Sequence, residues 1–224
     1  MTKMEILPND ISKILRDLYN FYPIGAEILN RDYAGYKKLE QIVAKKINSM
    51  LVSGNGAICP GLAEAFEHNF SEYAIVTEYE KQFPNYAISI ILDSVEDNSI
   101  SVSTCIKIRI SLLSKFYTYF VEEQTIDRNL SESTFSFRPL TSIVVSSNSS
   151  VFDPDRHFGP RIENILNPFL KDYYYIAHDL LLNQKIRFGN PVGFEIAGLM
   201  REFSLYDFLF DNEYCNIPNI IVNP

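Results

Sequence analysis

Residues Ser99 to Ser111 alternate between two kinds of side chain without a break. Every even position from Ile100 to Ile110 is apolar or β-branched, and every odd position is Ser, Cys, Lys or Arg. Successive side chains of a β-strand point to opposite faces, so this pattern predicts a strand with one packed face and one solvated face. Antiparallel sheets allow that arrangement, whereas a buried parallel strand is apolar on both faces. We therefore expect a long antiparallel strand at the centre of the fold, with its odd face in water.

Other strand patterns lie on both sides of this stretch, over residues 73–80, 86–93, 115–122 and 140–146. Apolar residues at helical spacing precede and follow them, and predict helices over residues 10–22, 31–50, 60–69, from Pro160, from Pro168 through Leu180, and over 194–203. The predicted fold is α+β: an antiparallel sheet of about four to five strands (residues 73–146) covered by N-terminal and C-terminal helices. We expect residues 1–224 to form a single domain.

The segment 115–122 carries large aromatic side chains on both faces of its predicted strand. This pattern indicates either that something packs on each side of the strand or that one aromatic face is a contact surface. The following residues, 123–137, are polar and show no clear period, and we expect them to form a loop.

Charge and composition limit the kinds of partner. The chain carries 20 basic and 28 acidic residues, a net charge of −8, which argues against nucleic-acid binding through a basic face and favours a basic protein partner. Its apolar runs are too short to span a membrane, and its N-terminus lacks the apolar region of a secretory signal, so we expect a cytoplasmic protein. Three cysteines without CxxC spacing fit free thiols in a reducing compartment.

Two local patterns suggest catalysis. Cys59 precedes a predicted helix, whose dipole favours a thiolate, although a histidine base would also be needed. Asp153, Asp155 and His157 have side chains that bind divalent metals, but acidic residues are also common where a chain enters a helix. A hydrolase that uses Cys59, or a metal near Asp155 and His157, is the alternative hypothesis, and neither a cofactor nor a metal site is part of the main prediction.

The C-terminal stretch Gly189–Pro224 holds five acidic residues against one arginine, interleaved with aromatic rings. Acidic groups around aromatic anchors are typical of a surface that docks a basic protein, while the alternative is that the rings complete the core. The predicted binding residues are Tyr206, Asp207, Phe208, Phe210, Asp211 and Glu213. The main hypothesis is therefore a non-enzymatic cytoplasmic protein that binds a basic partner. In size, acidity and low cysteine content the chain is similar to the immunity proteins that neutralise bacterial toxins, a likeness of composition that no motif carries.

Overall fold

The computed structural model describes residues 8–25, 32–53, 61–133, 136–147, 158–187, 189–191, 202–215 and 220–223. The described helices are α1 (Pro8–Tyr19), α2 (Ala34–Ser53), α3 (Leu62–Asn69), α4 (Gly159–Leu166), α5 (His178–Asn183) and α6 (Leu205–Leu209). The strands are β1 (Ala74–Thr77), β2 (Asn85–Glu96), β3 (Ile100–Ser111), β4 (Phe116–Ser133), β5 (Ser136–Ser146), β6 (Tyr174–Tyr175), β7 (Lys185–Arg187), β8 (Glu202–Ser204) and β9 (Ile220–Val222).

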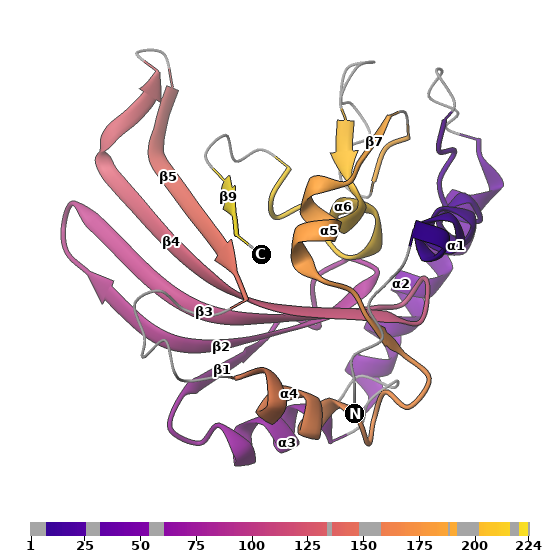
Figure 1. The fold of residues 1–224 in the computed structure, drawn as a ribbon, viewed down its shortest axis with the longest axis horizontal. Coiled ribbons are helices and arrows are strands. Elements are labelled where there is room, and N and C mark those ends of the chain that lie inside the picture. The colour runs from indigo at the N-terminus through magenta and orange to yellow at the C-terminus, as the bar shows by residue number, and fades with distance from the viewer. Residues whose placement is uncertain are drawn as a thin grey trace.

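Strands β1 to β5 form an antiparallel meander in the order of the chain. Two short strands extend this sheet in parallel pairing, β6 beside the start of β4 and β9 beside the end of β5. The sheet is strongly curved, with α5, α6 and β9 on its concave side and α3 and α4 against its convex side (Figure 1). The separate β7–β8 hairpin lies near α5 and α6 (Figure 1). The predicted α+β class is confirmed.

Each face of the sheet contributes to its own hydrophobic core. On the convex side, Ile106 and Ile108 of β3 pack in one cluster with Phe66 of α3 and Ile162 of α4. On the concave side, Phe120 of β4 packs in a second cluster, which also holds residues of α1, α2, α5 and α6.

The aromatic strand contributes to both cores. Phe116 and Phe120 belong to the concave cluster, and Tyr117 and Tyr119 belong to the convex one. The first reading of the segment 115–122, that side chains pack on each of its faces, is therefore confirmed.

Two sequence predictions about secondary structure are wrong. The polar residues 123–137 are not a loop, because β4 continues to Ser133 and β5 begins at Ser136. The predicted helix through residues 168–180 is also wrong over 168–177, and only its last three residues are helical, as the start of α5. In its place the Tyr174 and Ile176 amides donate to the carbonyls of Lys115 and Tyr117 at 2.9 Å, which holds β6 beside β4. Edge pairing with the sheet outweighs the helical spacing of the local sequence.

The expectation of a solvated odd face on β3 is also wrong in part. Cys105, Arg109 and Ser111 are at most 5% exposed, because the C-terminal segment covers them on the concave side. Conversely, the even residues Ile100 and Val102 are 44% and 38% exposed, since they lie at the end of the strand. The alternating pattern predicted the strand but not which parts of its two faces are covered.

Candidate functional site

The C-terminal segment 202–215 consists of β8, the short helix α6 and the residues that follow it. It packs against the concave face of the sheet. Ser204 caps this helix, because its hydroxyl accepts from the Asp207 amide at 3.3 Å while the Asp207 carboxylate accepts from the Ser204 amide at 2.7 Å. This reciprocal arrangement is the capping box, and its Ser-x-x-Asp spacing is visible in the sequence. All five residues of α6 are buried.

The structure brings the six predicted binding residues together, but in the interior. Tyr206, Phe208 and Phe210 are 0% exposed, and Asp207 and Asp211 are 6% and 7% exposed. Glu213 is half-buried. The expectation of an exposed acidic and aromatic surface is therefore not met. The rings fill the concave core, Asp211 and Glu213 face cations on the sheet, and Asp207 bonds to Ser204 in the cap of α6.

Asp211 is the centre of this buried contact. Its Oδ2 accepts from Arg109 Nε at 3.1 Å and from Asn85 Nδ2 at 3.0 Å, and the Tyr206 hydroxyl lies at 3.4 Å from the same oxygen. Burial raises the pKa of Asp211, although the Arg109 guanidinium opposes that shift. The carboxylate thus ties the segment to β2 and β3.

Glu213 and Glu122 complete the charge network. The Glu213 carboxylate accepts hydrogen bonds from Arg109 Nη2 at 2.9 Å and from Lys107 Nζ at 2.8 Å. Lys107 Nζ also lies 3.2 Å from Glu122 Oε1. The Tyr214 hydroxyl donates to the other oxygen of Glu122. Burial alone would raise the pKa of Glu213, but the two cations hold it at about 2.

The sheet makes room for the two long cations by means of small residues. Ala87 lies opposite Arg109 in the register of β2 and β3, and Ser89 lies opposite Lys107. Larger side chains at these two positions would occupy the space that the guanidinium and the C-terminal segment share. Because its charges are paired and buried, we assign the network to stability rather than to binding or catalysis.

A different group of acidic and apolar residues is exposed or partly exposed. Val95 lies opposite Val102, Asp93 and Glu123 both lie opposite Thr104, and Asp127 lies opposite Ile100. Directly paired residues of adjacent strands share a face, so these side chains all lie on the convex face, past the part that α3 and α4 cover. We call this group the acidic-aliphatic patch: Asp93, Val95, Ile100, Val102, Glu123 and Asp127.

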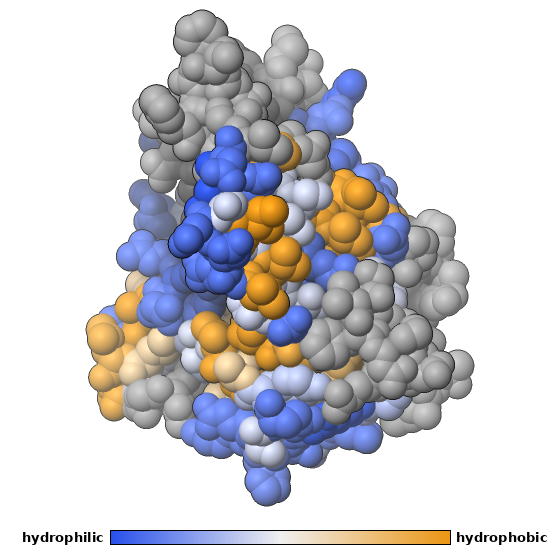
Figure 2. All heavy atoms as spheres, turned by 90° about the vertical axis from the view of Figure 1, so that its left-hand side faces the viewer, coloured by the Kyte–Doolittle hydropathy of each residue, from blue (hydrophilic) through white to orange (hydrophobic). Residues whose placement is uncertain are grey.

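The patch combines carboxylates with unusually exposed aliphatic side chains. Val95 is 60% exposed, more than Ile100 or Val102, and Asp93 is exposed beside it. Figure 2 looks onto this end of the sheet and shows hydrophobic side chains in orange next to hydrophilic ones in blue. No basic residue belongs to the patch; Arg128, beside Asp127 in the sequence, is paired with Glu96 at 2.6 Å.

The described part of the chain holds no observation that supports the hydrolase hypothesis. Cys59, Asp153, Asp155 and His157 lie outside the described residues. The two described cysteines, Cys105 and Cys215, are free, and burial raises the pKa of each thiol. The described residues contain no group of three or more side chains suited to hold a metal ion.

Comparisons with known proteins do not identify the chain. A scan against protein-family models found no match, and searches of curated proteins and of solved structures found none either. Among the helices of the described ranges, none is both long and apolar enough to cross a membrane.

Proposed function

We propose that this chain is a non-enzymatic cytoplasmic protein-binding protein that engages a basic partner through the acidic-aliphatic patch. The observation that carries the proposal is the exposure of three aliphatic side chains, by 38% to 60%, among three carboxylates on one face of the sheet. The proposal keeps the basic partner predicted from the sequence and replaces the buried C-terminal residues with an exposed surface.

The two kinds of side chain have separate roles in such an interface. Aliphatic groups lose water on binding and supply contact area, which contributes about 25 cal/mol for each Å² buried. Carboxylates speed the encounter with a basic surface and fix the orientation of the complex. The net charge of −8 adds a longer-range attraction for the same class of partner.

The small size and acidity that the chain shares with immunity proteins support the finer form of the proposal. In that form the chain is an inhibitor, and the basic partner is a toxin or enzyme that loses its activity when bound.

Partner capture from native cell lysate tests the charged half of the patch. The wild-type chain is compared with Asp93→Lys/Asp127→Lys and with Glu40→Lys/Glu67→Lys, which reverses two exposed carboxylates on α2 and α3. The proposal predicts that the wild type and the control variant retain one basic protein at low salt and that the patch variant loses it. Equal recovery by the two variants, or no basic protein with the wild type, would contradict it.

A second pair of variants tests the apolar half. Val95→Ser/Val102→Ser removes aliphatic contact area from the patch without changing its charge. The matched control is Leu51→Ser/Val52→Ser, because these residues are 80% and 89% exposed near the end of α2. Loss of the partner from the first variant alone would support the proposal, and loss from both would indicate a non-specific hydrophobic interaction.

The hydrolase hypothesis stays a prediction, since Cys59, Asp155 and His157 lie outside the described residues.

A further inference from the structure

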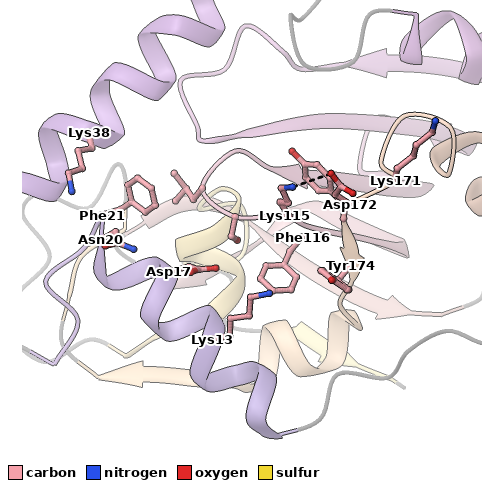
Figure 3. Close-up of a pocket in the computed structure, with 13 residues that line it drawn as sticks. Lys13, Asp17, Asn20, Phe21, Lys38, Lys115, Phe116, Lys171, Asp172 and Tyr174 are labelled. Atoms are coloured by element: carbon pink, nitrogen blue, oxygen red, sulfur yellow. Dashed lines mark hydrogen bonds and ion pairs between the residues drawn. The ribbon is translucent and has the colours of Figure 1, made fainter.

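A groove of about 730 Å³ lies on the opposite side of the molecule from the sheet end that carries the patch. Its walls come from α1, α2, the turn between β3 and β4, and the connection from α4 to β6 (Figure 3). Binding sites for small molecules usually enclose about 300–1,000 Å³, so the groove is large enough for a ligand of that class.

The groove is positive in a strongly acidic chain. Four lysines line it, Lys13, Lys38, Lys115 and Lys171, against the two carboxylates Asp17 and Asp172. These lysines come from separate elements, and Lys13 and Lys38 extend from α1 and α2 on either side of the groove (Figure 3). In a chain whose net charge is −8, four lysines against two carboxylates give this lysine groove a local excess of positive charge that favours an anionic ligand.

Its cations are available to such a ligand. Lys115 pairs with Asp172 at 3.2 Å, but the two side chains are 63% and 77% exposed, and exposed pairs contribute little stability. Neither Lys38 nor Lys171 has an ion-pair partner among the residues that the structure describes. An incoming anion would therefore displace few existing interactions.

The groove also presents an aromatic ring. Tyr174 is 43% exposed, and its ring centroid lies 6.2 Å from that of Phe116, which is buried in the concave core. Lys13 Nζ lies 5.2 Å from the centroid of the Tyr174 ring. The Lys13 ammonium lies over the face of this ring, so a ligand ring that stacks on Tyr174 takes the place of Lys13 there, while Lys13 turns toward the phosphates of the ligand. At the wall of the groove, the Ser114 hydroxyl has no hydrogen-bond partner among the described residues.

We propose that the lysine groove binds a small phosphorylated molecule that carries an aromatic ring. Several ammonium groups from different directions suit a phosphate, which presents charged oxygens on all sides, and lysine binds phosphate as a point charge. The ring of the ligand would stack on Tyr174, with its phosphates toward Lys13 and Lys38. This inference is independent of the patch and of the basic partner.

Isothermal titration with three probes separates the two parts of the ligand. Adenosine triphosphate supplies ring and phosphates, adenosine supplies the ring alone, and inorganic triphosphate supplies the phosphates alone. We expect adenosine triphosphate to bind most tightly and to weaken as NaCl rises from about 50 mM to about 300 mM. Absence of binding by all three probes would overturn the proposal, and equal affinity of both triphosphates would overturn the role of the ring.

Matched variants locate the site. Lys38→Gln is expected to weaken binding of adenosine triphosphate about threefold to fivefold. Its neighbour Lys37 is also exposed on α2 but does not line the groove, so Lys37→Gln is expected to leave the affinity unchanged. Equal weakening by the two variants would show diffuse attraction instead of a site.

Substitution of the ring provides the remaining comparison. Tyr174→Ala is expected to remove the advantage of adenosine triphosphate over inorganic triphosphate, while Tyr174→Phe retains it because the stacking face is kept. Near-ultraviolet circular dichroism checks that both variants are folded. Retention of the full advantage in folded Tyr174→Ala would overturn the stacking arrangement.

Discussion

Arg109, near the C-terminal end of β3, and Asp211, near the C-terminus, form a buried ion pair across 102 positions of the sequence, with 3.1 Å between Nε and Oδ2. Arg109 is 0% exposed and also contacts Glu213. The pair fixes the C-terminal segment on the concave face of the sheet, so Asp211 and Glu213 contribute to holding the fold together.

Removal of the cation from this pair is expected to be costly. Arg109→Leu leaves Asp211 and Glu213 facing the sheet without their guanidinium, and the free energy of unfolding should fall by about 3–5 kcal/mol. Urea unfolding measures the change. The control is Lys115→Leu, which breaks the exposed pair with Asp172 and should cost less than about 1 kcal/mol. Similar losses in both variants would contradict the structural role of the buried pair.

Stability at acid pH should depend on Glu213. The pKa of this carboxyl is about 2 in the folded chain, below its ordinary value of 4.5, because Lys107 and Arg109 outweigh the effect of burial. The folded state therefore binds fewer protons than the unfolded state between these values, and the stabilisation by Glu213 is lost as the pH falls through this range. The interval corresponds to at most about 3 kcal/mol, reduced by the partial exposure of the side chain.

The comparison of wild type with Glu213→Gln measures this contribution together with its effect on Asp211, because the Glu213 charge also raises the pKa of Asp211. The difference in unfolding free energy between the two proteins should be largest above about pH 4.5 and should shrink toward pH 2. A difference that stays constant over this range would contradict the assigned ion pairs.

The cap of α6 gives a third prediction. Ser204→Ala removes the acceptor for the Asp207 amide and should cost about 1 kcal/mol. Asp207→Lys should cost more, since it also places a cation in a position that is 6% exposed. Thermal unfolding measures both losses. If charge reversal at Asp207 left the melting temperature unchanged, the exposed C-terminal surface predicted from the sequence would be the better account.

The described thiols should be unreactive in the folded protein. Burial raises the pKa of Cys105 to about 12, and that of Cys215 is raised as well, so neither forms an appreciable thiolate at about pH 8. Iodoacetamide labelling followed by peptide mass spectrometry should modify both residues in urea and neither in native buffer. Labelling of native Cys105 at the rate of a free thiol would contradict its burial.

The same experiment tests the catalytic alternative. Rapid labelling of Cys59 at mildly acidic pH would favour a hydrolase, because only an activated thiol forms its thiolate there. Labelling that begins only near the ordinary thiol pKa of about 8.5 would argue against it.

Much of the fold can be predicted from the sequence where one face of an element is buried. The period of two in residues 99–111 and the helical spacing in α1 and α2 both follow from such burial. Residues 123–133 show no such period, because that part of β4 extends past the covering helices. Residues 123–129 are all partly or fully exposed, so no buried face imposes a pattern on the sequence there. Strand pairing there is visible only in three dimensions.

The candidate site could not be predicted from the sequence, because it depends on which strand residues the helices and the C-terminal segment bury. An acidic residue among aromatic rings is typical of both a docking surface and a buried ion pair, and only the position of Arg109 across the sheet distinguishes the two for Asp211. Likewise, Ile100 and Val102 share the pattern of Ile106 and Ile108, yet only the latter pair is packed in the convex core. The Ser204-x-x-Asp207 spacing was a local signal that could have predicted α6.

The most direct test of the proposed function is the dissociation constant of the captured basic partner for three chains: wild type, Asp93→Lys/Asp127→Lys and Glu40→Lys/Glu67→Lys. We predict that the patch variant binds at least about tenfold more weakly than the wild type at low salt, while the control variant stays within about twofold. Equal affinities of the two variants would contradict binding through the acidic-aliphatic patch.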